Sequence, residues 1–287
     1  MKRTISKNSL SSVLVTGGSG MVGSSVEFGM KPDHKEFNIL DMSKMRSWVR
    51  RHHPSAILHL AAFADMEGCE RNPAKAYELN VLGTYNLARV AKEFGVRLVY
   101  MSTCAVFDGK KKTPYTVNDV PAPLNVYGRT KSLGECAVLD IVPDSLVVRT
   151  GWLFGKGPGS EKKFINFCIR KLREGGEVRA TNDRFGSPTY IPDLLEAIGA
   201  LIRGKRRGVV HVVNKGTTSY FEVAQKIREY GGLQGKITAI SGKTVEKALV
   251  KRGVMEGLIT SVPMRSWQRA LKDYVSYKLS KESGLQS

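Results

Sequence analysis

The stretch Ser12-Val13-Leu14-Val15-Thr16-Gly17-Gly18-Ser19-Gly20-Met21-Val22-Gly23 decides the fold class. Its first five residues form a short apolar run rich in valine, typical of a buried strand. Gly17, Gly20 and Gly23 then interrupt the run at a spacing of three, and the residues from 21 to 28 can be helical. A tight glycine turn between a strand and a helix presents backbone N–H groups and a positive dipole end to a pyrophosphate. The pattern therefore predicts dinucleotide binding.

Beyond this stretch, apolar runs alternate with helix-compatible segments through the first half of the chain. Strands are expected at residues 56–60, 98–101 and 146–148, and a long helix is expected at 73–94. Near-continuous apolar runs are typical of strands that are buried on both faces of a parallel sheet. We therefore expect residues 1–150 to form a doubly wound α/β domain.

The second half of the chain has a more mixed pattern. Ser219 and Glu222 match a capping box, which opens a helix that runs to about residue 230. No internal repeat or low-complexity linker separates the two halves. We expect residues 151–287 to form a smaller mixed α/β lobe that packs on the first domain and returns some segments to it. The other elements expected here are helices at 164–174, at 191–202 and from Pro263 onward, and a strand at 209–213.

Composition excludes several classes of protein. The chain has 287 residues, of which 41% are hydrophobic and 25% charged, so a disordered or disulfide-scaffold protein is not expected. No stretch reaches the roughly 18 uncharged apolar residues of a membrane span. The basic N-terminus is not followed by an apolar segment, and the four cysteines show no paired spacing. These features predict a cytoplasmic protein with reduced thiols and no membrane span.

The net charge of +19 is unevenly distributed. Residues 1–150 carry 20 Lys and Arg against 14 Asp and Glu, whereas residues 151–287 carry 25 against 12. Such a field attracts polyanions, including phosphorylated small molecules, although a basic surface also serves solubility. The basic runs lack the interleaved aromatic residues of single-strand binders, so nucleic acid is not an expected partner.

A second motif, Tyr127-Gly128-Arg129-Thr130-Lys131, places a phenol and an ammonium on one face of a helix. An ammonium beside a phenol stabilises the phenolate and lowers the phenol pKa toward neutrality. Such a phenol can exchange a proton with an alcohol or a carbonyl oxygen. Ser102 and Thr103 end an expected strand, where parallel sheets hold their ligands, and a hydroxyl there can orient the same carbonyl oxygen.

The residue that reads the cofactor ribose is less sharply defined. Asp33, His34 and Lys35 follow the glycine turn at about the expected interval, and Asp41 comes later. An acid would accept a hydrogen bond from a ribose 2′-hydroxyl, whereas a cation would pair with a 2′-phosphate. His34 and Lys35 favour NADPH, with NADH still possible. A solvated turn is the alternative interpretation.

Taken together, these motifs resemble the dTDP-4-dehydrorhamnose reductase family of the extended short-chain dehydrogenase/reductase superfamily. The resemblance covers about residues 12–275. The matching segments are Val15-Thr16-Gly17-Gly18, Leu40-Asp41-Met42, His59-Leu60-Ala61-Ala62-Phe63, Pro123-Leu124-Asn125-Val126-Tyr127-Gly128-Arg129-Thr130-Lys131, Arg149-Thr150-Gly151-Trp152-Leu153-Phe154 and Asn182-Asp183-Arg184-Phe185-Gly186-Ser187-Pro188-Thr189.

The resemblance implies a Rossmann-type NAD(P)-binding domain over residues 1–150 and a substrate lobe over residues 151–287. It implies an NADPH-dependent oxidoreductase that reduces C4 of a nucleotide-linked 4-keto-6-deoxy sugar, converting dTDP-4-dehydro-L-rhamnose to dTDP-L-rhamnose for polysaccharide biosynthesis. Tyr127 would donate the proton, and Lys131 would lower the Tyr127 pKa and bind the nicotinamide ribose. Thr103, with Ser102, would hold the carbonyl oxygen.

With the motifs above, the resemblance also assigns ligand-binding residues. The cofactor-binding positions are Gly17, Gly20, Met21, Val22, Gly23, Lys35, Asp41, Met42, Ala61, Ala62, Phe63, Tyr127 and Lys131. The substrate-binding positions are Cys104, Ala105, Trp152, Arg184, which could face the diphosphate, and Arg252. Some relatives dimerise around Mg²⁺ held by glutamates, but Ser25 occupies the matching position here. No metal is therefore expected, and a homodimer stays possible.

Other members of the superfamily are rival interpretations. A 4,6-dehydratase needs an Asp-Glu pair after Thr103, where this chain has Cys104 and Ala105. A bifunctional epimerase/reductase uses a cysteine at the Cys104 position, but its partner histidine is missing near residues 162–163. A 4-epimerase would share Tyr127 and Lys131 and hold its cofactor permanently. The regulatory subunit of methionine adenosyltransferase also resembles this fold, and it would bind NADP and a partner enzyme without turnover.

Overall fold

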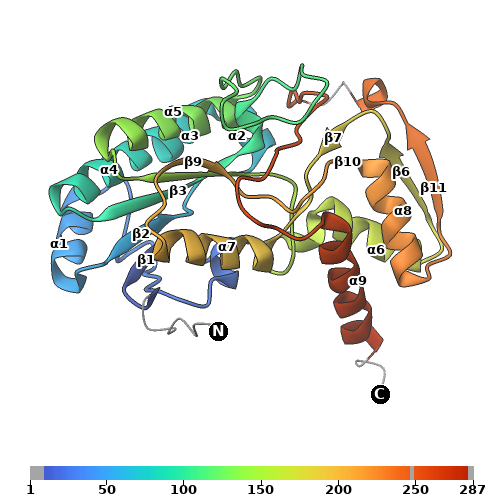
Figure 1. Cartoon of the computed structure of the whole chain (residues 1–287), viewed down its shortest axis with the longest axis horizontal. Helices are drawn as coiled ribbons and strands as arrows, with labels where there is room; N and C mark the ends of the chain where they lie inside the picture. Colours follow the sequence, from blue (N-terminus) through green and yellow to red (C-terminus); the bar gives the residue numbers. More distant parts are fainter. Residues whose placement is uncertain (1–9, 246–248, 284–287) are drawn as a thin grey trace.

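The central feature of the computed structural model is a five-stranded parallel sheet (Figure 1). The structure describes residues 10–245 and 249–283. The sheet order β1-β2-β3-β4-β9 follows the order of these strands along the chain. All of its pairings are parallel, as the near-continuous apolar runs predicted. The strands are β1 (Val13–Thr16), β2 (Ala56–His59), β3 (Arg97–Thr103), β4 (Leu146–Thr150) and β9 (Gly208–His211).

Helices that connect successive strands cover one face of this sheet (Figure 1). Their apolar side chains form one core with the sheet, in which Met45, Leu87 and Val138 are completely buried. The helix expected at 73–94 is present, but five of its residues adopt π-helical geometry. These elements are α1 (Met42–His52), α2 (Met66–Arg71), α3 (Pro73–Tyr77), the π segment η3 (Glu78–Leu82), α4 (Gly83–Glu93) and α5 (Val126–Ile141).

A single long helix from the second half of the chain covers the opposite face. Helix α7 (Ile191–Arg203) packs Leu194 and Ile198 against Val13 and Val148 of the sheet. Residues beyond 150 thus return to the first half of the molecule to provide both α7 and the last strand of the sheet. The fold is the Rossmann-like α/β class that the sequence predicted.

The segment after the glycine turn differs from the prediction. The helix expected from residue 21 to residue 28 is reduced to one 3₁₀ turn, η2 (Gly23–Ser25). Gly29 then adopts a positive φ of 76°, and Met30 pairs beside β1 through hydrogen bonds of 2.7 and 2.8 Å. The chain between η2 and α1 is too short to form a helix, a full second strand and the connection back to α1. In the described residues, Met30 therefore stands in for a further strand, and β1 lies at the edge of the sheet.

The C-terminal half contributes a second core. Helices α6 (Phe164–Arg173) and α8 (Tyr220–Gly231) pack on the parallel pair β6 (Glu177–Thr181) and β11 (Lys236–Ile240) (Figure 1). Helix α9 (Trp267–Ser283) packs against α8 and completes this core. Ser219 caps α8 as predicted, because its hydroxyl accepts a hydrogen bond from Glu222 N. The remaining strands are β5 (Leu153–Phe154), β7 (Phe185–Gly186), β8 (Thr189–Tyr190) and β10 (Thr218–Ser219).

The last helix begins later than expected. Helix α9 starts at Trp267 instead of Pro263, and the Ser266 hydroxyl accepts a hydrogen bond of 3.4 Å from Arg269 N at its first turn. Residues 263–265 are needed for another contact, because Lys215 pairs with this segment through the Arg265 carbonyl. None of the helices in the described part of the chain has the length and apolar character required to cross a bilayer.

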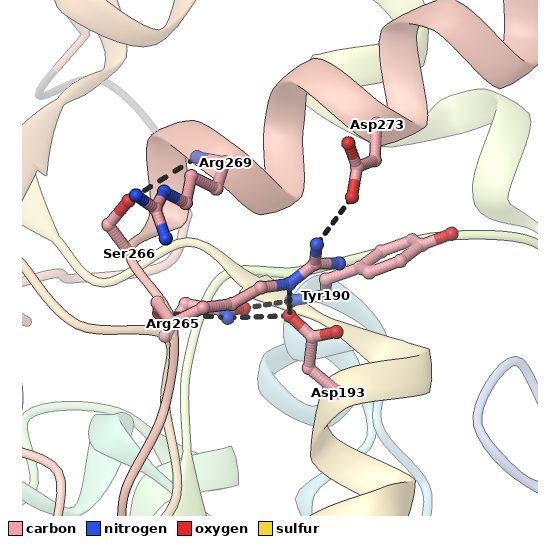
Figure 2. Close-up of polar contacts among 7 residues, drawn as sticks. Tyr190, Asp193, Arg265, Ser266, Arg269 and Asp273 are labelled. Atoms are coloured by element: carbon pink, nitrogen blue, oxygen red, sulfur yellow. Dashed lines mark hydrogen bonds and ion pairs between the residues drawn. The ribbon is translucent and has the colours of Figure 1, made fainter.

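Arg265 fastens the C-terminal helix to the rest of the molecule (Figure 2). Its Nε donates a hydrogen bond of 2.7 Å to Asp193 of α7, and its Nη1 pairs with Asp273 of α9. Asn214 donates a second hydrogen bond to Asp193, and its amide oxygen accepts from Tyr190 N. One guanidinium therefore links the helix below the sheet to the helix of the second core.

Candidate active site

The glycine turn after β1 has the geometry of an anion cradle. Gly17 adopts a φ of 69°, and a Cβ at this position would lie 2.6 Å from Ala61 N. A Cβ on Gly23 would lie 2.1 Å from Gly17 O. These contacts require glycine. In the described part of the chain, the N–H groups of Met21 and Val22 have no hydrogen-bond acceptor, as expected for donors that bind a pyrophosphate. Gly20 and these two residues are partly exposed and thus accessible to a ligand.

A buried chain of hydrogen bonds connects this turn to the next loop. Ala61 N donates to Thr16 Oγ1, which lies 2.7 Å from His59 Nδ1. His59 Nε2 lies 3.1 Å from Thr84 Oγ1, which donates to Asn80 O. Thr84 must therefore accept from His59, so the His59 proton lies on Nε2. Burial lowers the pKa of His59 to about 3, with a further contribution from Lys131, so the ring is neutral.

Asn80 positions the loop that follows β2. Its side-chain oxygen accepts from Phe63 N at 2.7 Å, and its Nδ2 donates to Phe63 O and to Thr130 Oγ1. Asn80 is buried within the π-helical segment η3, which supplies the extra residue per turn that directs this side chain inward. The predicted cofactor residues Ala61, Ala62 and Phe63 thus lie in a loop that is tied both to the glycine turn and to α5.

The residues predicted to bind the cofactor ribose, Lys35 and Asp41, lie in different surroundings. Asp41 caps α1 by accepting from Lys44 N at 3.0 Å, and Met42 is the first residue of that helix. Lys35 lies in an exposed turn in which Asp33 accepts hydrogen bonds from the backbone N–H groups of residues 35 and 36. The lysine whose stem packs on the glycine turn is Lys31 instead, since its side-chain carbons lie within 3.2 Å of a Cβ built on Gly18. Its ammonium donates a hydrogen bond to Val26 O.

Helix α5 brings Tyr127 to the end of β3. Asn125 caps the helix by accepting from Gly128 N at 2.8 Å. A Cβ on Gly128 would lie 2.1 Å from Ala105 O, so glycine allows the helix to approach the loop after β3 closely. Thr103 at the end of β3 accepts a hydrogen bond from Ala105 N and interacts with the Tyr127 hydroxyl. The structure therefore brings Thr103 and Tyr127 together beside Ala105.

The pKa of Tyr127 differs in direction from the prediction. Burial raises the pKa of the phenol above its ordinary value, and Cys104 and Cys69 add to this, whereas Thr103 opposes it. Lys131 does not lower it in this structure, because its ammonium lies over the Tyr100 ring, 4.0 Å from the centroid. Tyr127 is consequently a protonated phenol at neutral pH, which is the form that donates a proton.

Lys131 is buried and sits one helical turn after Tyr127. Burial lowers the pKa of Lys131 to about 7, and the carboxylate of Glu135 opposes this shift. The ammonium and its neutral form are therefore both accessible near neutral pH. A lysine of this kind responds strongly to the charges placed around it.

Ser102 has a different role from the one expected. Successive residues of a strand point to opposite faces, so Ser102 points away from Thr103. The Ser102 hydroxyl donates to Glu135 Oε1 at 2.5 Å, and Arg149 forms a two-point ion pair with the same carboxylate at 2.9 and 2.6 Å. All three side chains are buried. Ser102 thus contacts the partner of Lys131 and does not share a carbonyl oxygen with Thr103.

The opposite wall of the site comes from the second half of the chain. Trp152 stacks on Tyr220 with ring centroids 3.8 Å apart, and its Nε1 donates to Glu256 Oε2 at 2.7 Å. Arg252 interacts with the Tyr220 hydroxyl and is electrostatically coupled to Glu256 and Cys104. Burial raises the pKa of Cys104 to about 12, with Glu256 adding to the shift, so the thiol is neutral.

Arg184 lies apart from this group. Its guanidinium donates a hydrogen bond of 3.2 Å to Gly242 O, beside Asp183. Sequence reasoning did not identify Lys31, Asn80, Glu135, Tyr220 or Glu256. Glu135 could have been found, because it continues the four-residue spacing from Tyr127 through Lys131 on α5. Glu256 follows no helical or strand period and carries no such signal.

Two features place the protein among the short-chain dehydrogenases/reductases. One is a protonated tyrosine followed four residues later by a buried lysine, on the helix beside the end of a parallel strand. The other is the glycine turn after β1. Within that class the comparison is specific. A family model described as the RmlD substrate binding domain matches residues 11–278, and the chain belongs to that family.

Known relatives cover nearly the whole chain. The spore coat polysaccharide biosynthesis protein SpsK of Bacillus subtilis is 32% identical, with 94% of this chain and 99% of the relative covered. A dTDP-4-dehydrorhamnose reductase of Mycobacterium tuberculosis is 33% identical, with 90% of each chain covered. The crystal structure of dTDP-4-dehydrorhamnose reductase from Bacillus anthracis in complex with NADP is 30% identical and superimposes with a TM-score of 0.86, covering 92% of this chain and 98% of that one.

Proposed function

We propose that this protein is an NADPH-dependent reductase of a dTDP-linked 4-keto-6-deoxy sugar, with dTDP-4-dehydro-L-rhamnose as its substrate and dTDP-L-rhamnose as its product. The observation that carries the proposal is the contact of Thr103 with Tyr127 at the end of β3, with Lys131 one helical turn further along α5. The relatives named dTDP-4-dehydrorhamnose reductase support the sugar, and the one solved with NADP supports the cofactor.

The chain has the groups that a dinucleotide needs. The free N–H groups of Met21 and Val22 would hold the pyrophosphate, and the loop from Ala61 to Phe63 would line the nicotinamide half. Lys131 would bind the nicotinamide ribose. When bound, the reduced dinucleotide supplies the hydride for C4 of the sugar.

The residues of the chain supply the proton. Reduction of a ketone generates an alkoxide, and Tyr127 donates its phenolic proton to that oxygen. The Thr103 hydroxyl holds the same oxygen and interacts with the phenol. To stabilise the phenolate that remains until solvent returns the proton, the Lys131 ammonium would have to leave the Tyr100 ring. A raised Tyr127 pKa suits this direction of reaction, since the phenol begins each cycle protonated.

The second half of the chain would bind the sugar nucleotide. We assign Cys104, Ala105 and Trp152 to the sugar pocket, and Arg252 and Arg184 to the diphosphate. The excess positive charge of residues 151–287 raises the local concentration of such an anion. The division into a cofactor part, residues 1–150, and a substrate part, residues 151–287, belongs to this proposal, as do a cytoplasmic location and a homodimer.

The test is consumption of NADPH with the 4-keto sugar nucleotide supplied by an upstream dehydratase and epimerase. Wild type and the control Tyr85→Phe, an exposed tyrosine on α4, should turn over equally. Tyr127→Phe should lose about 10²- to 10⁴-fold in kcat while it still binds NADPH. Tight NADPH binding without turnover on any nucleotide sugar would overturn the proposal, and capture of a methionine adenosyltransferase would then favour the regulatory subunit.

A further inference from the structure

An irregular segment bridges the catalytic helix and the wall formed by the second half of the chain. We call residues 251–258 the strap. At one end, Lys251 O accepts a hydrogen bond of 2.9 Å from Asn125, the cap of α5. Further along, the strap runs beside β7 through hydrogen bonds of 2.8 and 2.7 Å with the backbone of Phe185 (Figure 1). The strap is thus anchored two residues from Tyr127 and also to the second half of the chain.

The strap supplies the hydrogen-bond acceptor of the Trp152 indole. Glu256 Oε2 accepts from Trp152 Nε1 at 2.7 Å, a distance typical of a charge-assisted hydrogen bond. The indole also stacks on Tyr220 and packs against Gly186, where a Cβ would lie 2.1 Å from the ring. Trp152 is therefore held at its ring face and at its nitrogen.

The backbone conformation of Trp152 indicates why its hydrogen bond to Glu256 matters. Trp152 has a φ of 41°, in the left-handed region that non-glycine residues rarely occupy. A residue keeps such a backbone conformation only where the surrounding contacts hold it there, and residues of this kind cluster at functional sites. Stacking alone allows an indole to slide in its plane, whereas a hydrogen bond to Nε1 fixes its in-plane orientation. Glu256 supplies that bond.

A cation and a neutral thiol lie near the Glu256 carboxylate. Arg252, on the same strap, is coupled to Glu256 and to the Tyr220 hydroxyl. Cys104 faces the same carboxylate and is a neutral thiol, because burial raises its pKa to about 12. The arrangement pairs each polar end of the stacked rings with one charge of the strap: the indole N–H with Glu256, and the phenol with Arg252.

We propose that Glu256 is a positioning residue that fixes Trp152 as a wall of the sugar pocket, so that the strap sets the affinity for the sugar nucleotide. This inference rests on the proposed function for its substrate. Glu256 acts through the indole and takes no part in proton transfer. Loss of the contact therefore weakens substrate binding, with little effect on kcat once the site is saturated.

The experiment compares Glu256→Leu with the conservative Glu256→Gln, whose amide oxygen still accepts from the indole. Glu256→Leu should raise KM for the sugar nucleotide about 10-fold, with kcat and KM for NADPH changed by less than about 3-fold. Glu256→Gln should stay within about 3-fold of wild type on all three parameters. Glu196→Leu, an exposed glutamate on α7, is the matched control.

A double-mutant cycle tests whether the effect passes through Trp152. In a Trp152→Phe background, Glu256→Leu should add nothing to KM, because phenylalanine has no N–H to position. Indole fluorescence gives a readout without turnover: acrylamide should quench Glu256→Leu more than wild type, and this difference should vanish with Trp152→Phe. An unchanged KM in Glu256→Leu, or an effect that persists with Trp152→Phe, would overturn the inference. A wild type that turns over no sugar nucleotide would overturn the proposed function, while the quenching comparison would still decide the positioning of Trp152.

Discussion

Glu135 Oε2 accepts a hydrogen bond of 2.6 Å from Arg149 Nη2 inside the core, one helical turn beyond Lys131. The carboxylate is about 4% exposed and the guanidinium about 5%, so solvent screens neither. Ser102 donates to the same carboxylate from β3. The negative charge therefore sits between two buried cations, and it is the opposing influence on the lowered pKa of Lys131.

We predict that Glu135→Gln moves the pH dependence of turnover to lower pH. Burial lowers the pKa of Lys131 to about 7, and the negative charge of Glu135 opposes this shift. Removal of the Glu135 charge should therefore lower the pKa of Lys131 below this value. The ammonium is the active form and exists below the pKa, so the alkaline loss of kcat should begin at lower pH. The measurement is kcat against pH, with the exposed Glu67→Gln as control.

Stability must be measured alongside this profile. Removing one partner of a buried pair leaves Arg149 uncompensated and costs about 3–5 kcal/mol. The pH profiles of wild type and variant are therefore compared at a temperature at which circular dichroism shows that the variant is folded. An alkaline limb that coincides with that of wild type would show that Glu135 does not tune Lys131.

We predict that Lys31, and not Lys35, sets the preference for NADPH. Lys31 follows Met30 at the end of its pairing with β1 and lies over Gly18, whereas Lys35 belongs to an exposed turn. A charge-assisted contact to a 2′-phosphate is worth about 1.5–3 kcal/mol. Lys31→Ala should lower the ratio of kcat/KM for NADPH over NADH by roughly 10- to 100-fold. Lys35→Ala should leave the ratio unchanged, and the reverse result would return the role to the residue predicted from sequence.

We predict that His59 makes the fold sensitive to acid. The folded-state pKa of about 3 lies below the ordinary value of 6.5, so the unfolded chain binds a proton first as the pH falls. Stability from this residue is complete above pH 6.5 and is lost as the pH falls toward about 3. By pH 5 the loss is ~2 kcal/mol. Urea unfolding at pH 7.5 and pH 5 should show it.

The matching variant is His59→Asn. It should be less stable than wild type at pH 7.5, because the hydrogen bonds to Thr16 and Thr84 are disturbed. Its stability should then fall less between the two pH values. An equal fall in both proteins would mean that other groups govern acid unfolding.

We predict that Arg265→Met loosens the C-terminal helix. The guanidinium joins Asp193 and Asp273 and is about one third exposed, so the loss should be modest, about 1–2 kcal/mol (Figure 2). Hydrogen exchange should rise first in α9. Arg269→Met on the same helix is the control, since Arg269 contacts Ser266 through its backbone N–H, which the substitution keeps. Equal exchange in the two variants would contradict the role given to Arg265.

The sequence predicted the sheet well because buried parallel strands are short apolar runs, which are visible without any knowledge of contacts. It also predicted that Tyr127 and Lys131 lie four residues apart on one helix, as they do on α5. The helix expected at residues 21–28 was wrong, because the turn at Gly29 and the pairing of Met30 depend on a contact with β1.

The surroundings of the site were predictable only in part. The direction of the Tyr127 pKa was missed, because burial outweighs an ammonium that rests on the Tyr100 ring. Ser102 was grouped with Thr103 by adjacency, although the strand pleat separates them. Glu256 reaches the site along an irregular strap, and such long-range contacts leave no periodic trace in a sequence.

The pairing of a single residue, Met30, beside β1 has a consequence for the release of the dinucleotide from the site. In the doubly wound sheet, further strands beyond the first flank the adenosine end of a dinucleotide. The sheet of this protein ends at β1 within residues 10–245 and 249–283, with exposed Lys31 next to it. Fewer enclosing contacts mean faster dissociation. A reductase spends one dinucleotide per cycle and must release it, so an open-ended cradle favours turnover, whereas an epimerase that keeps its cofactor would gain from a closed one.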